Sequence, residues 1–497
     1  MIKLPLLPTC SMKGTLLPVL IYCAGIAGSL SQPAHPLQPN IVFVVADDMG
    51  AWALGKGGGP NSYTPVLDKM AGAGISLRNC FANGAVCSPS RAALISGRYP
   101  SETGVTDIIP QNTAGGLSLE LSTLPGVLQA GGYNTALVGK WHLGEYKDAY
   151  MPRQRGYGRF TGFPHGGMQS MSPEIMIEDK WHTAEGAYTE DALTDYAMKY
   201  MQELDPARTG KPFFLTLHYW APHANVKFPE GRKPTYKGRS WLPLNPEDTP
   251  YWDTLSVKLP DPDFPNLDKP LLERMIREYH ASVHSIDRNM GKLISFLESH
   301  SLLENTVIIF TSDHGYMLGH NGLWHKGSGW WLTADESDPK GIYGTVRPNL
   351  YDNTLRVPAI IYWPGKISSP VIINETVDFT DWFPTVLEMT GGKPTERLTL
   401  RGKSIVPLLH GKTRGWDNDL YAEYKELRTY RTPEWKIVLD FSDNRRHELY
   451  NLANDPAEKQ NLYHSRDAVA VRQRDLLKSK LLAKMKTIND PLTAKAP

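Results

Sequence analysis

The stretch I-V-F-V-V-A-D-D at residues 41–48 indicates the fold of this chain. Its first six residues form a continuous apolar run, which ends abruptly at the adjacent carboxylates of Asp47 and Asp48. A short apolar run without polar alternation is typical of a strand that is buried on both faces of a parallel sheet. We therefore expect residues 41–46 to form a central parallel strand with two carboxylates at its carboxyl end.

The same pattern recurs four times along the chain. Further strands of this kind are predicted at residues 135–139, 212–217, 306–311 and 357–362. Between them, apolar residues recur at helical spacing in residues 189–204 and 271–299,. This alternation predicts an α/β fold with a doubly wound, mostly parallel sheet.

The chain has three predicted parts. Residues 1–31 form a targeting segment, residues 38–400 the α/β domain, and residues 414–497 a smaller α+β subdomain. In that subdomain, residues 420–424 and 435–441 alternate as antiparallel strands do, and a polar helix ends the chain,. Residues 221–270 are rich in proline and aromatic residues and are too long for an ordinary connection, so we expect them to cover the site,.

Polar clusters follow four of the predicted strands. They are D-D at residues 47–48, G-K-W-H at 139–142, H-Y-W-A-P-H at 218–223 and S-D-H-G at 312–315. Ligands of open α/β sheets bind beyond the carboxyl ends of the strands, so these clusters predict one shared site.

Two of these clusters predict a divalent cation. Adjacent carboxylates such as Asp47 and Asp48 repel each other unless a cation neutralises them, and Asp313-His314 lies in the same context,. Calcium prefers oxygen to the nitrogen of His314, so ligand chemistry alone leaves magnesium or manganese open. The alternative is that these aspartates cap the helices that follow.

The run C-S-P-S-R at residues 87–91 places a thiol at the mouth of a predicted helix. Ser88 is a good N-cap, and Pro89 suits the first helical position,. The free N–H groups and the dipole of a helix start favour an anion beside Cys87. The alternatives are a small buried cysteine before an ordinary helix, or a disulfide between Cys80 and Cys87.

Composition excludes some functional classes. Of the 497 residues 41% are hydrophobic, and 53 basic against 52 acidic residues leave a net charge of +1. This is the composition of a globular protein, and the absence of a basic block gives no case for nucleic-acid binding.

The N-terminal segment predicts export. Residues 16–28 form an apolar run that follows Lys13 and is too short to span a bilayer,. The alternatives are a short membrane anchor or a buried helix, and translation could start at Met1 or Met12. The four cysteines and the single sequon at Asn374 favour a secreted or periplasmic bacterial protein with no membrane span in the mature chain,.

Several motifs resemble those of a known family. The run C-S-P-S-R, followed by G-R at residues 97–98, resembles the maturation signature of the formylglycine sulfatases, and G-Y-N-T-A-L-V-G-K-W-H at residues 132–142 resembles their second signature. The order of motifs agrees with this family across residues 40–364. Residues 448–458 resemble part of its C-terminal subdomain.

The resemblance implies an alkaline-phosphatase-like fold, one Ca²⁺ per chain, and a formylglycine made from Cys87. A formylglycine-generating or an anaerobic maturation enzyme would make that modification. The implied metal ligands are Asp47, Asp48, Asp313, His314 and the modified Cys87.

The resemblance also implies a mechanism. One hydroxyl of the hydrated formylglycine attacks sulfur, while Arg91, Lys140 and Lys326 neutralise the sulfate oxygens. His223 protonates the departing alcohol, and His142 is a candidate base for the step that expels sulfate. Alternatively, Lys140 lies on the surface and His142 is a packed residue. We expect His218 to be packed.

One segment departs from the family pattern. Residues 327–348 intervene before L-Y-D-N-T-L-R-V-P at residues 350–358. We expect this insertion to wall the substrate pocket and select a glycan. Its candidate substrate-binding residues, with those just before it, are Trp324, His325, Trp330, Trp331 and Arg347. The alternative is that its tryptophans pack on the proline-rich segment around Trp241 and Trp252.

Together these observations predict an exported sulfatase that acts on a sulfated polysaccharide or oligosaccharide. A phosphonate or phosphate diester hydrolase of the same superfamily is the nearest alternative enzyme. A binding protein for sulfated glycans that has lost turnover is the alternative from a different class.

Overall fold

A computed structural model describes residues 38–55, 58–145, 147–225, 240–248, 250, 254–333, 346–367, 370–392 and 398–495 of the chain. Residues 38–497 belong to one compact unit. The predicted targeting segment lies outside the described residues. Among those described, no helix combines the length and the apolar character needed to cross a bilayer.

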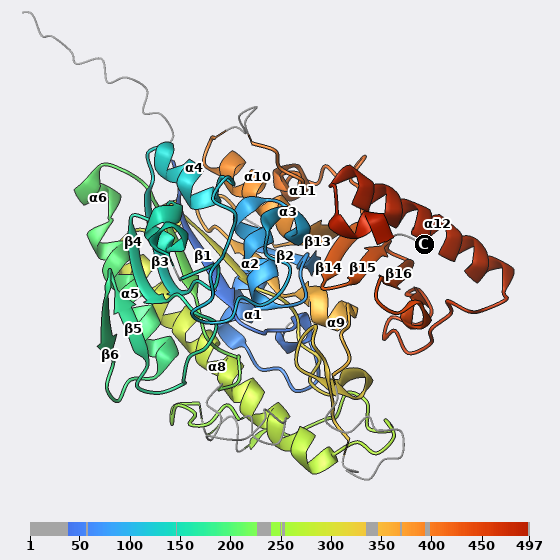
Figure 1. Cartoon of the computed structure of the whole chain (residues 1–497). Helices are drawn as coiled ribbons and strands as arrows, with labels where there is room; N and C mark the ends of the chain where they lie inside the picture. Colours follow the sequence, from blue (N-terminus) through green and yellow to red (C-terminus); the bar gives the residue numbers. More distant parts are fainter. Residues whose placement is uncertain are drawn as a thin grey trace, which may run out of the picture. The chain divides into compact units, whose positions relative to one another are not determined.

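The main element is a sheet of eleven strands (Figure 1). In spatial order its strands are β11 (Arg356–Val357), β2 (Ile75–Phe81), β12 (Ala359–Tyr362), β8 (Thr306–Ser312), β1 (Asn40–Ala46), β7 (Phe213–His218), β3 (Asn134–Lys140), β4 (Arg159–Phe163), β5 (Glu174–Ile177) and β6 (Lys180–Thr183), and β13 (Val371–Asp378) pairs with β2. The five strands from β8 to β4 are all parallel. The prediction that residues 41–46 form a central parallel strand is therefore confirmed.

Helices cover both faces of the sheet, because alternate side chains of each buried strand point to opposite sides. Val42 and Val44 join one hydrophobic cluster, whereas Ile41 and Phe43 join another. The first cluster includes α1 (Pro65–Ala73), α5 (Thr189–Glu203) and α8 (Lys269–Ser299). The second includes α2 (Cys87–Ser96), α4 (Leu124–Ala130), α10 (Phe379–Met389) and α11 (Val406–Leu409).

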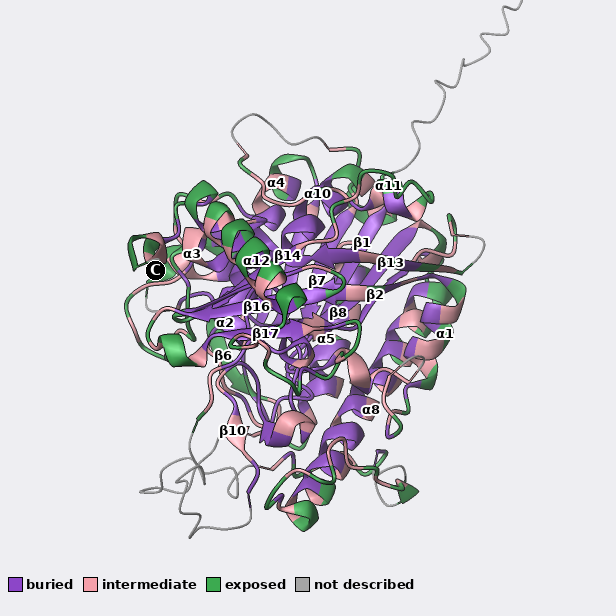
Figure 2. Ribbon diagram, turned by 90° about the vertical axis from the view of Figure 1, so that its right-hand side faces the viewer, coloured by how far each residue is buried: buried purple, intermediate pink, exposed green. Residues whose placement is uncertain are grey.

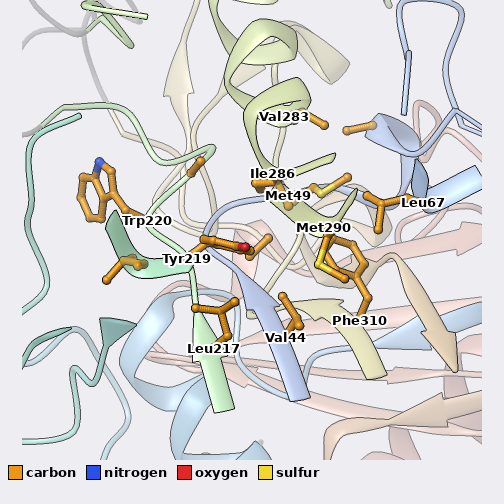
Figure 3. Packing of buried hydrophobic residues seen from close by; sticks show 14 of the residues in the cluster. Val44, Met49, Leu67, Leu217, Tyr219, Trp220, Val283, Ile286, Met290 and Phe310 are labelled. Carbon is orange, nitrogen blue, oxygen red and sulfur yellow. The ribbon is translucent and has the colours of Figure 1, made fainter. Parts of the chain in front are cut away.

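The apolar repeat of residues 271–299 is the buried stripe of α8. Figure 3 shows Ile286 and Met290 of this helix above Val44 and Phe310 of neighbouring strands. All four side chains are fully buried. Burying each such side chain stabilises the fold by about 1.5–3 kcal/mol. Together these contacts hold α8 against the sheet that carries the site.

One predicted strand has the wrong direction. Residues 357–362 follow the pattern of the parallel strands, but β12 runs antiparallel to both β8 and β2. The reason is the edge at which each strand lies: β8 ends at the carboxyl edge with Ser312, and β12 begins at the same edge, since Ala359 pairs with Thr311. The parallel strands end at this edge, so a strand that begins there runs in the opposite direction to them.

The C-terminal subdomain contains a four-stranded antiparallel sheet covered by one long helix. Its strands are β14 (Leu420–Tyr424), β15 (Leu427–Arg431), β16 (Trp435–Asp440) and β17 (Glu448–Asn451), and its helix is α12 (Ala468–Thr487). Figure 2 shows the exposed outer face of α12 over buried strands. The carboxylate of Glu423 accepts hydrogen bonds from the N–H and hydroxyl groups of Ser101 at 2.9 and 2.8 Å, which joins this subdomain to the α/β domain.

The remaining described α-helices and strands are short. They are α3 (Pro100–Thr103), α6 (Pro206–Thr209), α9 (Asp352–Leu355), β9 (Leu323–Trp324) and β10 (Trp330–Trp331). Strands β9 and β10 form a two-stranded hairpin just beyond the carboxyl edge of β8.

Candidate active site

Cys87 is the first residue of α2, as the sequence predicts for a helix mouth. The prediction that Ser88 is the N-cap is wrong, since the cap is Val86, whose carbonyl accepts the N–H of Ser90 at 3.2 Å. The hydroxyl of Ser88 instead accepts the N–H of Ile109 at 3.1 Å. Every residue of α2 is buried, and Cys87 is only 2% exposed.

Both candidate cysteines are free, so the disulfide alternative is excluded. Burial raises the pKa of Cys80 well above its usual range, which makes that thiol inert,. Burial also opposes ionisation of Cys87, but Lys140 and Lys326 lower the pKa of its thiol. Of the two cysteines that the structure describes, Cys80 is therefore inert and Cys87 lies in an electropositive environment.

The predicted metal ligands converge at the carboxyl ends of β1 and β8. Ligand atoms of Asp47, Cys87, Asp313 and His314 all lie within 4.8 Å of one another. Nε2 of His314 is 3.1 Å from Oδ1 of Asp48, and Sγ of Cys87 is 3.7 Å from Oδ1 of Asp47. Asp47 and Asp48 do not cap a helix, because the short helix after them begins at residue 51 with Gly50 as its cap.

This cluster fits a divalent cation. Oδ2 of Asp48 is buried and accepts no hydrogen bond from the described residues. Nδ1 of His314 lies 2.8 Å from the carbonyl oxygen of Gly315, an arrangement that places a proton on Nδ1 and leaves Nε2 free to bind a metal,. Burial disfavours imidazolium, yet Asp313 and Asp48 raise the pKa of His314 to about 9, which reflects the negative charge around Nε2.

Two lysines contact the carboxylates that directly follow β1. Nζ of Lys140 donates to Oδ2 of Asp47 at 2.5 Å, and Nζ of Lys326 donates to Oδ1 of Asp48 at 2.6 Å and to Sγ of Cys87 at 2.9 Å. Burial alone would raise the pKa of Asp47, but Lys140 holds it well below its usual range. For Asp48, burial outweighs Lys326 and raises the pKa to about 7. Lys140 is fully buried, which excludes the alternative of a surface lysine.

Arg91 contacts Asp313, one of the predicted metal ligands, and is not among the described residues that line the cavity at Cys87. Its Nε and Nη2 are each 3.0 Å from Oδ2 of Asp313, and its Nη1 is 3.2 Å from both the carbonyl of Lys140 and Nδ1 of His218. The side chain is only 2% exposed. Arg91 thus contacts Asp313, Lys140 and His218, and the sulfate contact that we expected from the sequence stays a prediction.

A cavity of about 440 Å³ opens beside Cys87 and brings together several of the predicted residues. His142, His223, His325 and Lys326 line it with Cys87. Nδ1 of His223 lies 2.7 Å from the carbonyl of Ala224, and its Nε2 lies 3.6 Å from Oδ2 of Asp48.

Two other histidines have contrasting environments. Nε2 of His142 faces the carbonyl of Ile109 at 3.1 Å, and its buried Nδ1 makes no hydrogen bond with the described residues. Burial holds the pKa of His142 well below its usual range, so the neutral form of this imidazole is favoured. His218 is packed against Arg91 and Lys140, as expected from the sequence.

The insertion contributes little to this cavity among the described residues. Of the five candidate substrate residues, only His325 lines it. Trp324 is buried, Trp331 stacks on Phe264 at 5.8 Å, and Arg347 forms an ion pair of 2.6 Å with Glu448. Trp330 pairs with Trp324 in the hairpin and packs against the main core.

The contact of Trp331 with Phe264 agrees with the alternative of packing on the proline-rich segment. Trp252 and residues 334–345 of the insertion lie outside the described residues.

The sequence analysis missed part of the cavity wall. Residues Ile108, Ile109, Pro110, Gln111, His165, Gly166, Gly167, Met168, Gln169 and Glu174 also line the cavity. The sequence did contain a signal, because P-H-G-G at residues 164–167 directly follows β4, another parallel strand.

Comparison with known families agrees with this arrangement. A family profile described as "Sulfatase" matches residues 39–392, which is more than half of the chain. The chain belongs to the sulfatase family. It is therefore a sulfuric ester hydrolase, and family membership implies a formylglycine and a divalent metal ion. A second profile, described as the C-terminal part of N-sulphoglucosamine sulphohydrolase, matches residues 346–487 of this sulfatase.

Individual sulfatases are similar over most of the chain. An N-acetylglucosamine-6-O-sulfatase of Bacteroides thetaiotaomicron is 27% identical over 90% of this chain and 88% of its own. An N-acetylgalactosamine-6-sulfatase of Rattus norvegicus is 29% identical over 79% of this chain and 69% of its own.

A solved structure, described as a complex with its substrate D-glucosamine-2-N,6-O-disulfate, has a TM-score of 0.70. It is 24% identical and covers 91% of this sulfatase and 98% of its own chain. The predicted alkaline-phosphatase-like α/β fold with a C-terminal subdomain is confirmed.

Proposed function

We propose that this sulfatase hydrolyses sulfate esters of a sulfated oligosaccharide or polysaccharide with a formylglycine made from Cys87. The observation that carries the proposal is the position of Cys87. It lies at the start of α2, 2.9 Å from Lys326 and beside a cavity that His142 and His223 also line. A helix start and an ammonium group both favour an anion at this point.

The residues present fit both groups that the family implies. The ion would be held by Asp47, Asp48, Asp313, His314 and the modified Cys87, and we propose Ca²⁺ as its identity. When bound, it acts as a Lewis acid and stabilises negative charge. The formylglycine supplies a hydroxyl nucleophile as its hydrate, which unmodified cysteine lacks.

The chain's own side chains then have distinct tasks. Lys326 is the cationic group on the cavity wall, so it neutralises charge that develops on the sulfate oxygens. Lys140 and Arg91 hold Asp47 and Asp313 in place. His223 donates a proton to the departing alcohol, and the neutral His142 accepts a proton during release of sulfate.

Support for a sugar substrate comes from the relatives. The two curated enzymes described above are named for 6-sulfated amino sugars, and the solved complex contains a disulfated glucosamine. We further propose export of the chain on the basis of residues 16–28, and modification of Cys87 by a maturation enzyme.

A panel of sulfated sugars tests the function directly. Purified enzyme is incubated with monosaccharides and oligosaccharides sulfated at different positions, with 4-nitrophenyl sulfate, and with a phosphate diester, and the released anion is measured. We expect sulfate release from at least one sugar. Turnover of the phosphate diester alone would contradict the proposal and favour the superfamily alternative.

The role of His223 makes a separate prediction. We expect His223→Ala to lower kcat about 100-fold or more on a sugar sulfate and less than about tenfold on 4-nitrophenyl sulfate. A general acid matters most when the leaving group is a poor one, such as a sugar hydroxyl. Steady-state kinetics on both substrates check this, and an equal loss on both would remove His223 from the role.

A further inference from the structure

A second cavity adjoins the one at Cys87. Its volume is about 580 Å³, and it shares Gln111, His165 and Glu174 with the first cavity. Its other lining residues are Asn112, Glu145, Met151, Pro164, Met176 and Trp181. Because three residues line both cavities, the two cavities are direct neighbours, and we refer to them together as the groove.

Trp181 provides a flat aromatic surface in this groove. It lies on the short strand β6, its side chain is 49% exposed, and its ring stacks on His165 with centroids 5.8 Å apart and an angle of 15° between the planes. Sugar rings have an apolar face that packs on such a surface, while the indole N–H remains available to a hydroxyl.

Strand geometry explains why Trp181 faces the groove. Trp181 pairs with Met176 across β5 and β6, so both side chains lie on the same face of the hairpin,. Ile175, the neighbour of Met176 in the strand, points to the opposite face and is buried in the main core,. Because Ile175 is packed in the core, the hairpin is held with Trp181 on the face that lies toward the groove.

The charged groups that line the second cavity disfavour an anionic ligand. Glu145 and Glu174 line it, and no lysine or arginine does so among the described residues. The carboxylate of Glu145 accepts the N–H of Asn112 at 2.8 Å, which holds the loop that carries Gln111. Burial lowers the pKa of His165, so this ring is neutral. Two carboxylates repel an anion, whereas amides and carboxylates bind sugar hydroxyl groups.

We propose that this second cavity binds an uncharged sugar residue that is linked to the sulfated sugar held at Cys87. The proposal rests on the proposed function and adds the class of neighbouring residue that the enzyme accepts. It predicts a preference for a sulfated sugar with a neutral neighbour over one with a uronic acid or a second sulfate at that position.

The test uses three probes built on the sulfated monosaccharide that the enzyme hydrolyses best. They are that monosaccharide, its disaccharide with galactose, and its disaccharide with glucuronic acid. For the wild type we expect kcat/KM to be highest on the galactose disaccharide. Trp181→Ala should lower the ratio of disaccharide to monosaccharide kcat/KM about tenfold, and Trp181→Phe should restore most of it.

His182→Ala is the matched control. His182 follows Trp181 in β6 and is exposed, but its side chain points to the other face of the strand,. This variant should keep the ratio of the wild type. Replacing Glu174 by lysine should raise kcat/KM about fivefold on the glucuronic acid disaccharide relative to the galactose disaccharide.

The outcomes separate the two proposals. If Trp181→Ala leaves the ratio unchanged, the sugar-binding role of the second cavity is overturned while the sulfatase function stands. A higher kcat/KM of the wild type on the glucuronic acid disaccharide than on the galactose disaccharide would also overturn this role. Release of sulfate from 4-nitrophenyl sulfate but from no sugar overturns both proposals.

Discussion

Replacing Cys87 with alanine is expected to abolish sulfate release, with a loss of at least about 10⁴-fold in kcat, while the fold is retained. The thiol is the only reactive side chain at the start of α2, and alanine cannot become a formylglycine. Since Cys87 is buried beside polar groups and its side chain is small, we expect the melting temperature to change by a few degrees at most,.

Cys80→Ala is the matched control for this prediction. Cys80 is also buried and free, but it is packed in the hydrophobic cluster on the α2 side of the sheet. Its substitution should leave the rate of sulfate release within about threefold of the wild type. Sulfate release by Cys87→Ala above a blank would refute the role of Cys87, and mass spectrometry of the peptide that contains Cys87 reports whether it is modified in the wild type.

Removing the divalent cation is expected to have the second-largest effect, a loss of about 10³-fold in activity. Three carboxylates surround the proposed position, and one oxygen of Asp48 has no hydrogen-bond partner among the described residues. Treatment with EGTA should inactivate the enzyme, and separate additions of Ca²⁺, Mg²⁺ and Mn²⁺ identify the ion that restores it. EGTA saturated with Ca²⁺ is the control for chelator effects.

A second readout does not depend on turnover. A ligand that binds only the folded state at a hundred times its Kd stabilises it by about 2.7 kcal/mol. The melting temperature of the wild type should therefore rise with Ca²⁺, and that of Asp48→Asn should rise much less. If full activity survives EGTA and metal analysis finds no ion, the site assignment is wrong.

The sequence predicted the parallel strands well because each is buried on both faces. Such a strand has to be apolar throughout, and residues 41–46 and 306–311 both show this. The direction of residues 357–362 could not be predicted in this way. A buried antiparallel strand has the same composition as a buried parallel one. Its direction depends on the edge of the sheet at which the strand begins.

The site was predictable to the extent that it depends on topology. Asp47, Lys140 and Asp313 each end a parallel strand or directly follow one, so their meeting at one edge follows from the fold. The position of Arg91 beside Asp313 was not predictable, because a motif does not tell which side of a helix faces the cavity. The stacking of Trp181 on His165 depends on how the strands β4, β5 and β6 pair, and no local pattern encodes that.

The burial of α2 also has a consequence for the time at which Cys87 can be modified. The maturation enzyme that we propose would have to reach Cys87 before α2 packs against α10, and α10 ends at Met389. Roughly 300 residues separate the two elements, and ribosomes add about 5–20 residues per second, so synthesis of this stretch takes about 15–60 s. During this interval α10 has not yet been synthesised, so α2 cannot be fully buried. Modification thus competes with the completion of synthesis, and changes in translation speed should alter the fraction of active enzyme.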